Sequence, residues 1–199
     1  MRDQDAASNF SWQKRFRSGY FVAAQIATYA PHRGAILSTL SGESQLYTWD
    51  PLTGNLNQLT HTPGGFLAPY RITPDGKYLV YLQDEGGSNI GHYVRHDYDD
   101  GEISDLTPDL PPYPGISFDM SRDGNILGFT IATEQGFEVH LVDLSAPARP
   151  VWRLTSFTSF ALGPSLSSNG SVAIVASTAR SESMAFGLEA FSREGDKLA

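Results

Sequence analysis

A repeat of about 47 residues constrains this chain more than any other feature of its sequence. An Asp-Gly or Asn-Gly pair recurs, with glycine spacings of 48 and 46 residues, at Asp75-Gly76, Asp123-Gly124 and Asn169-Gly170. A second landmark keeps the same period, with spacings of 47 and 48 residues, at Leu59-Thr60, Leu106-Thr107 and Leu154-Thr155. Self-similarity at such a period is typical of repeat architectures. The chain is therefore expected to stack copies of one small unit.

Each copy reads as a four-stranded antiparallel meander. Apolar, β-compatible runs follow each turn, and the second unit shows this most clearly with Tyr78–Leu82 and then Ile90–Val94. Asp-Gly and Asn-Gly predict tight two-residue hairpins, because glycine adopts positive φ without a steric penalty. A weaker first copy of the turn is Pro31-His32-Arg33-Gly34. The runs at 126–131 and 172–176 are apolar almost throughout, which indicates strands covered on both faces.

These observations predict an all-β fold. A meander of about 40–50 residues with both faces buried is typical of a β-propeller blade. A helical fold is excluded because the 19 glycines and 12 prolines interrupt any helical pattern within a short distance. We expect residues 1–33 to be a leading segment and opening strand, and residues 34–199 to form β-propeller blades. The expected blades, about four in number, are approximately residues 20–66, 67–113, 114–160 and 161–199.

The second unit resembles a known repeat. The runs 70–82, 89–94 and 101–107, which include Thr73-Pro74-Asp75-Gly76, look like the WD40-like PD40 repeat. That repeat builds the propellers of TolB and of the prolyl oligopeptidase (S9) serine peptidases. The resemblance covers about residues 20–199. The third and fourth units depart from it, since Arg122 and Ser168 replace the proline.

The resemblance implies two alternative functions. In the first, the chain is the propeller portion of an S9-type serine peptidase of the prolyl oligopeptidase or acylaminoacyl peptidase kind, which gates the access of peptides to a hydrolase domain. The catalytic Ser, Asp and His would then lie beyond residue 199, and this chain alone would be inert. In the alternative, it is a TolB-like, non-catalytic scaffold that binds a protein partner. The reading frame downstream of Ala199 discriminates between the two.

The repeat also predicts an incomplete last unit. A turn glycine precedes the Leu-Thr pair by five residues at Gly54 and at Gly101, and the equivalent Gly195 places the next leucine at position 200. We therefore expect part of a larger propeller whose end blades each have an uncovered face. The expected partners are the missing C-terminal blades with an α/β-hydrolase domain, or a second copy in a homodimer.

The residues that most resemble catalytic or metal-binding groups have structural explanations. Gly163-Pro164-Ser165 lacks the second glycine of a nucleophile elbow and is expected to be the first strand of the fourth blade. His92 and His96, spaced four apart on a strand, would lie roughly 13 Å apart, too far to share a metal. The five histidines are expected to be solvated or locally hydrogen-bonded; the others are His32, His61 and His140.

The remaining motifs favour turns. The acidic run 97–102 does not place glycine and glutamate where a calcium loop needs them, so it is expected to be a hairpin turn. Gly64-Gly65 and Gly86-Gly87 lack the strand-to-helix context of a phosphate loop and are expected to be blade turns. We therefore assign no catalytic, cofactor-binding or metal-binding residue and expect no cofactor.

Charge and composition limit the kinds of molecule that this chain is expected to bind. A net charge of −8 argues against binding to nucleic acid, and no run is long and apolar enough for a membrane helix. With no cysteine and no apolar leader after Met1, a cytoplasmic location is expected. Residues 1–33 carry a charge of +3 and the rest −11. Lys14, Arg15 and Arg17, interleaved with aromatic residues, either bind an acidic partner or pack against the acidic body of this chain.

Overall fold

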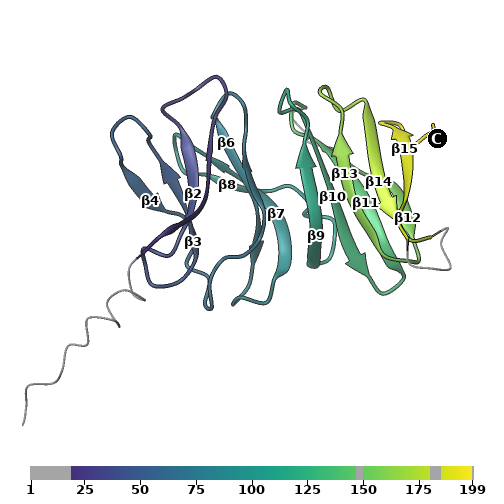
Figure 1. Ribbon diagram of the computed structural model, residues 1–199, viewed down its shortest axis with the longest axis horizontal. Helices are drawn as coiled ribbons and strands as arrows, with labels where there is room; N and C mark the ends of the chain where they lie inside the picture. Colours follow the sequence, from purple (N-terminus) through teal and green to yellow (C-terminus); the bar gives the residue numbers. More distant parts are fainter. Residues whose placement is uncertain (1–18, 147–149, 180–184, 199) are drawn as a thin grey trace, which may run out of the picture.

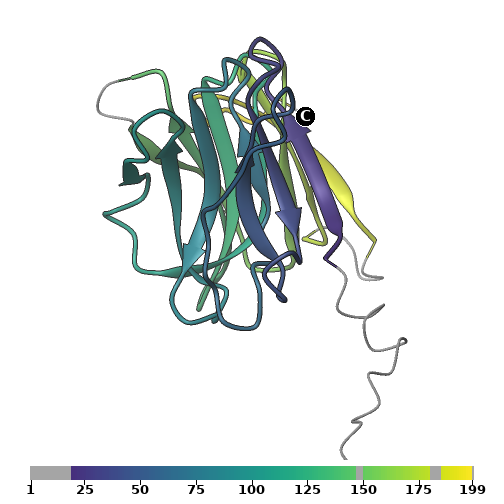
Figure 2. The same cartoon turned by 90° about the vertical axis from the view of Figure 1, so that its left-hand side faces the viewer.

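The computed structural model describes residues 19–146, 150–179 and 185–198. Within these ranges the chain forms strands and turns and no helix, which confirms the all-β prediction. Four antiparallel meanders, here called the first to fourth units, follow one another in sequence order (Figure 1). Figure 2, turned by 90° so that the first unit faces the viewer, shows the sheets one behind another.

The first unit contains β1 (Phe21–Ile26), β2 (Gly34–Ser38), β3 (Gln45–Trp49) and β4 (Leu56–Gln58). The second contains β5 (Tyr70–Ile72), β6 (Tyr78–Asp84), β7 (Ile90–Asp97) and β8 (Ile103–Asp105). The third contains β9 (Tyr113–Met120), β10 (Ile126–Thr133), β11 (Gly136–Asp143) and β12 (Val151–Phe157). The fourth contains β13 (Ala161–Leu166), β14 (Val172–Ser177) and β15 (Gly187–Ser192).

Within each unit, every strand pairs with the next along the chain. The expected opening strand is present, since β1 pairs with β2. Among the described residues, one strand pairing crosses between units: β7 pairs with β9 at Ile90–Pro114 and Gly91–Tyr113, which joins the second and third units into one eight-stranded sheet. In the fourth unit a bridge from Phe191 to Lys197 continues the sheet beyond β15.

Three separate apolar cores lie between successive units. The middle strands of a unit supply two of these cores at once, because side chains alternate between the faces of a strand. On β6, Leu79 and Tyr81 pack in the core shared with the first unit, whereas Val80 and Leu82 pack in the core shared with the third. The near-continuous apolar runs in the sequence are therefore explained by strands whose two faces are both buried.

The Asp-Gly turns differ from the two-residue hairpins that the sequence predicted. In the second unit the N–H of Thr73 donates to the carbonyl of Tyr78, so four residues form the loop and only Gly76 has positive φ. The Asp75 carboxylate accepts hydrogen bonds from the Thr73 hydroxyl at 2.7 Å and the Lys77 N–H at 3.1 Å. Aspartate is thus selected as an acceptor that closes the loop. The same bonds recur at Ser121, Asp123 and Gly124 and at Ser167, Asn169 and Gly170.

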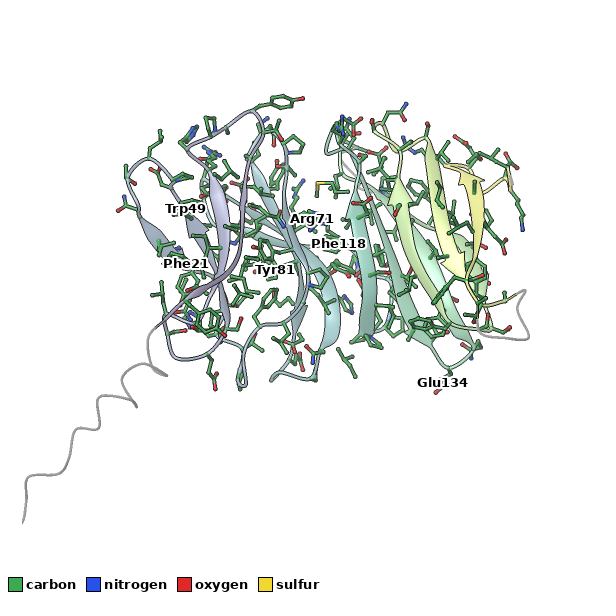
Figure 3. All side chains as sticks on the ribbon, viewed as in Figure 1. Phe21, Trp49, Arg71, Tyr81, Phe118 and Glu134 are labelled. Carbon is green, nitrogen blue, oxygen red and sulfur yellow. The ribbon has the colours of Figure 1, made fainter. Side chains whose placement is uncertain are left out.

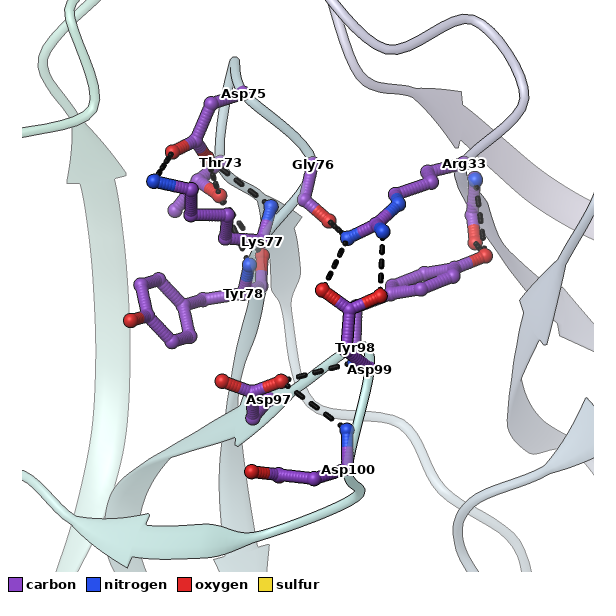
Figure 4. Close-up of polar contacts among 11 residues, drawn as sticks. Arg33, Thr73, Asp75, Gly76, Lys77, Tyr78, Asp97, Tyr98, Asp99 and Asp100 are labelled. Carbon is purple, nitrogen blue, oxygen red and sulfur yellow. Dashed lines mark hydrogen bonds and ion pairs between the residues drawn. The ribbon is translucent and has the colours of Figure 1, made fainter.

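In the first turn, 27–33, Arg33 occupies the position that Gly76 has in the second unit. The Arg33 side chain bonds the first unit to the second. Arg33 donates to the carbonyl of Gly76 at 3.2 Å and forms a bidentate ion pair with Asp99 (Figure 4). The Tyr98 hydroxyl accepts from the Gly34 N–H and lies 2.8 Å from the carbonyl of Trp49. These bonds fix the first unit against the second.

Polar groups also hold the fourth unit against the third. The hydroxyls of Ser117 and Thr130 donate to the carbonyl of Gly163 at 2.7 and 2.6 Å. The carboxylate of Asp119 accepts from the Leu166 N–H at 2.9 Å. The inner strand β13 is therefore hydrogen-bonded to side chains of the preceding unit as well as to β14.

The two end units carry exposed apolar side chains. On β1, Phe21 and Val22 are 60% and 50% exposed. At the opposite end, Ile174 on β14 is 44% exposed and Leu188 on β15 is 72% exposed, while Val175, which points the other way, is fully buried. The outward faces of the first and last described sheets therefore leave apolar surface in contact with solvent.

Candidate functional site

The residues that were considered as candidates for catalysis or for metal or phosphate binding lie mainly in strands and turns. Ser165 lies near the end of β13 and pairs with Ile174, as expected of the first strand of the fourth unit. The acidic run forms a hairpin turn, in which the Asp97 carboxylate accepts from the N–H groups of Asp99 and Asp100. Gly64, Gly65, Gly86 and Gly87 all lie in loops and have positive φ.

The histidines correct one expectation. His92 is hydrogen-bonded to Asp105 at 2.7 Å, and His140 to Glu138 at 3.0 Å, as the local-bonding prediction requires. His96 departs from the prediction, because it is buried rather than solvated, with 9% of its surface exposed; His140 is also buried, with 4% exposed, but keeps its local hydrogen bond. Burial lowers the pKa of both imidazoles because it disfavours the charged form. Side chains alternate between the two faces of β7 and β11, and both imidazoles lie on buried positions of these strands. Amino-acid composition alone does not predict that burial.

Two arginines lie on either side of Val80, on the face of the second unit that is turned toward the third. Arg71 on β5 pairs in register with Val80, and Val80 pairs with Arg95 on β7, so all three side chains share one face. The Arg71 guanidinium lies 5.3 Å from the ring centre of Phe118 in the third unit, and Figure 3 shows the two together near the centre of the molecule. The Arg95 guanidinium lies 4.0 Å from the ring centre of Tyr78.

Neither arginine has an acidic partner among the described residues. Arg71 donates to the carbonyl of Tyr70 at 3.0 Å, and Arg95 has its contact with Tyr78. The other described cations mostly form ion pairs, such as Arg33 with Asp99 and Arg193 with Asp143. In a chain with eight more acidic than basic residues, this lack of a carboxylate is notable.

Arg95 lines a cavity of about 420 Å³ between the second and third units, which we call the arginine cleft. The carboxylates within it are already engaged: Asp75 with Thr73 and Lys77, and Asp123 with Ser121. These hydrogen bonds keep the pKa of both carboxyls below the usual value, against the opposing effect of desolvation. The lining residues are Thr73, Pro74, Asp75, Lys77, Tyr78, Arg95, Asp123, Gly124, Asn125, Leu144, Ser145 and Ala146.

A ladder of four stacked rings supports the same junction. His92, Tyr113, Phe129 and His140 come from β7, β9, β10 and β11, and successive rings lie 5.6, 5.8 and 5.5 Å apart with interplanar angles of 16° or less. Each end of the ladder is held by a carboxylate, Asp105 or Glu138. The second and third units are therefore joined by a rigid aromatic layer. This layer could not be predicted from the repeat, because the β7–β9 pairing joins strands from different units.

Two tyrosines in this junction are expected to respond oppositely to loss of the hydroxyl. The Tyr113 hydroxyl accepts from the Tyr93 N–H at 2.9 Å and contacts Thr107 at 2.8 Å, and burial raises the pKa of Tyr113 to about 12. The buried Tyr93 hydroxyl has no hydrogen-bond partner in the structure. Tyr113→Phe should therefore cost about 2 kcal/mol of unfolding free energy, whereas Tyr93→Phe should cost nothing or stabilise the fold.

Urea unfolding followed by circular dichroism distinguishes these outcomes. The two variants remove the same atom from neighbouring buried rings, so each is the control for the other. Equal destabilisation by both would show that the hydrogen bonds of Tyr113 do not matter for stability.

The described residues show neither a metal site nor a membrane-spanning helix. Across the ranges that the structure describes, no group of three or more His, Asp or Glu side chains is arranged to hold a metal ion. In those same ranges no helix is long and apolar enough to cross a membrane.

Comparison with known proteins identifies the fold. No family model and no curated protein sequence matches this chain. Among solved structures, TolB from Acinetobacter baumannii is similar with a TM-score of 0.61 and 24% identity over 84% of this chain. A putative TolB from Agrobacterium tumefaciens gives a TM-score of 0.63 and 17% identity over 87% of this chain. The tricorn protease gives 0.61 and 12% identity over 86%.

These similarities are partial in length. The chain spans 39% and 61% of the two TolB structures and 18% of the tricorn protease. Because all three identities are below 25%, the comparisons establish architecture and leave activity open. The described residues of this chain have the fold of TolB-like β-propeller proteins.

Proposed function

We propose that this chain belongs to a TolB-like, non-catalytic propeller that binds an acidic segment of a partner protein in the arginine cleft. The observation that carries the proposal is the pair Arg71 and Arg95, which share one face without a carboxylate partner in the described chain. A guanidinium stacked on a ring keeps its N–H edge available for a carboxylate, and such bidentate pairs are strong. The similarity to two TolB structures supports the scaffold class.

The cleft fits a side chain or short loop rather than a large ligand. Its volume of about 420 Å³ lies near the lower end of the usual range for small-molecule sites. The turns that form its rim are tied by their own hydrogen bonds, as at Asp75 and Asp123, so the rim is organised before binding. A preorganised site loses less conformational entropy when the partner binds.

Binding of a fluorescein-labelled peptide with four consecutive glutamates tests this proposal. Arg95→Glu should weaken binding at least tenfold, because it replaces an attractive charge with a repulsive one inside the cleft. Arg122→Glu is the matched control, since Arg122 also lacks an ion pair among the described residues, is exposed and does not line the cleft. Equal affinities for the two variants, or no measurable binding to the unmodified protein, would refute the acidic-segment proposal.

A second candidate function is the propeller of a peptidase, which gates peptides toward a hydrolase domain. The observation that favours it is the similarity to the tricorn protease, although that match spans 18% of the protease chain. In this case the catalytic Ser, Asp and His would lie in sequence beyond residue 199. A fluorophosphonate probe for active serines, applied to the protein isolated from its own cells, would label a product that carries this sequence if the peptidase proposal holds.

The open end faces suggest what completes the assembly. Further blades, or a second copy placed end to end, would cover Phe21 and Val22 at one end and Ile174 and Leu188 at the other. Burial of apolar surface contributes about 25 cal/mol per Å² before the cost of association is deducted. Light scattering on the purified chain separates self-association from a stable monomer.

A further inference from the structure

A second hollow, distinct from the arginine cleft, lies on the outer part of the second unit. It has a volume of about 830 Å³ and is formed by the end of β6, the start of β7, and β8. Ile90 and Ile103 contribute an apolar floor, and they are 45% and 47% exposed. Its lining residues are Gln83, Asp84, Glu85, Ser88, Ile90, Gly91, His92, Val94, Ile103, Asp105 and Pro112. We call it the acidic groove.

The carboxylates of the groove have no basic partner from lysine or arginine among the residues that the structure describes. Asp84 accepts from the N–H of Asn89 at 2.7 Å, and Asp105 contacts His92. Glu85 forms no ion pair with any described residue. Three carboxylates beside exposed isoleucines therefore form a surface that suits a segment with both cations and apolar side chains.

This chain contains such a segment shortly before Gly19, its first described residue. Residues 10–17 read Phe-Ser-Trp-Gln-Lys-Arg-Phe-Arg, with three aromatic side chains, three cations and no acidic residue. The segment lies outside the described residues. Its charge of +3 contrasts with −11 for residues 34–199, so it is the most basic stretch available to the groove.

The topology places the start of the described chain at the same end as the groove. β6 begins after the Asp-Gly turn, so its last residue, Asp84, lies at the opposite end of the unit. β1 runs toward the turn 27–33, which touches the second turn through the Tyr29 N–H and the carbonyl of Pro74. Phe21 therefore also lies at the end opposite the turns. The groove shares Gln83, Asp84 and Ile103 with the cavity at the boundary with the first unit.

From these observations we propose that residues 10–17 of the same chain dock in the acidic groove. The aromatic side chains cover Ile90 and Ile103, and Lys14, Arg15 and Arg17 pair with Asp84, Glu85 and Asp105. This proposal is independent of the function of the arginine cleft, which lies at the turn end of the second unit.

A disulfide cross-link in the full-length chain tests the proposal directly, because the natural sequence contains no cysteine. The test variant carries Ser11→Cys and Ser88→Cys, the latter in the groove. The control carries Ser11→Cys and Gln135→Cys, in the exposed turn between β10 and β11 at the same end of the molecule. Under mild oxidation the test pair should cross-link at least tenfold faster than the control pair, and Glu85→Lys should slow it several-fold.

Equal cross-linking rates for the two cysteine pairs would overturn the proposal. A cross-linking rate of the test pair that Glu85→Lys does not change would also overturn it. Cross-links that form only between two copies would also overturn it and would assign the groove to a second chain. A measurement without cysteines provides an independent check: the emission difference between the unmodified protein and Trp12→Phe isolates Trp12. Docking predicts that this emission is protected from acrylamide, and full quenching would contradict docking.

Discussion

Replacement of Phe129 by alanine is expected to lower the free energy of unfolding by about 4 kcal/mol, as is usual for a large aromatic side chain removed from a core. Phe129 is fully buried, and its ring lies 5.0 Å from the ring of Tyr93, 5.8 Å from Tyr113 and 5.5 Å from His140. Its loss removes one step of the ring ladder and leaves a cavity between the second and third units. Urea unfolding monitored by circular dichroism measures the effect.

Phe186→Ala is the matched control for that experiment. Phe186 is half exposed, and its ring makes an edge contact with Phe160 at 6.1 Å. We expect it to cost less than about 1 kcal/mol, as surface substitutions usually do. Similar costs for the two phenylalanines would mean that the junction between the second and third units is not a packed core.

Gly128→Ala is expected to destabilise the protein strongly, by about 3 kcal/mol, the upper range for an overpacked core. A Cβ at this position would overlap the Cγ of Pro164 and lie 3.0 Å from Cδ2 of Leu141. The proline belongs to the inner strand of the fourth unit, so the close approach of third and fourth units depends on the missing side chain. The backbone of Gly128 does not have positive φ, so the cost is steric alone.

Gly187→Ala provides the contrast, because Gly187 also lies in a strand and has ordinary φ. A Cβ there meets only the carbonyl of Ser177, at 3.9 Å. Since alanine restricts the unfolded chain, this change should stabilise the protein by up to about 1 kcal/mol. Thermal unfolding compares the two variants, and a stabilising Gly128→Ala would contradict the packing of these units.

The repeat made most of the architecture predictable from sequence. The spacing of the Asp-Gly and Asn-Gly pairs located the equivalent turn in the second, third and fourth units, and apolar runs such as 126–131 marked strands buried on both faces. The turn type was wrong, because sequence reasoning assigned positive φ to the Asp-Gly pair and missed the role of Thr73, Ser121 and Ser167. The Ser/Thr-x-Asp/Asn-Gly spacing, present three times in the chain, was the signal for it.

The candidate site was not predictable in the same way. Arg71 and Arg95 are 24 positions apart, and only the register of β5 and β7 on β6 places them on one face, on either side of Val80. The ring ladder depends on the pairing of β7 with β9, which joins different units. An arginine within an otherwise apolar strand, as in Tyr70-Arg71-Ile72, was the only local signal for an unusual position.

Binding of a partner's carboxylates in the arginine cleft should be visible at the arginines themselves. Nuclear magnetic resonance of the arginine side chains, during titration with the tetraglutamate peptide, measures it. The Nε–Hε signal of Arg95 should shift first and saturably, with that of Arg71 following, while the signal of Arg122 does not move. Saturable shifts confined to Arg122 or other exposed cations, with Arg95 unchanged, would contradict it.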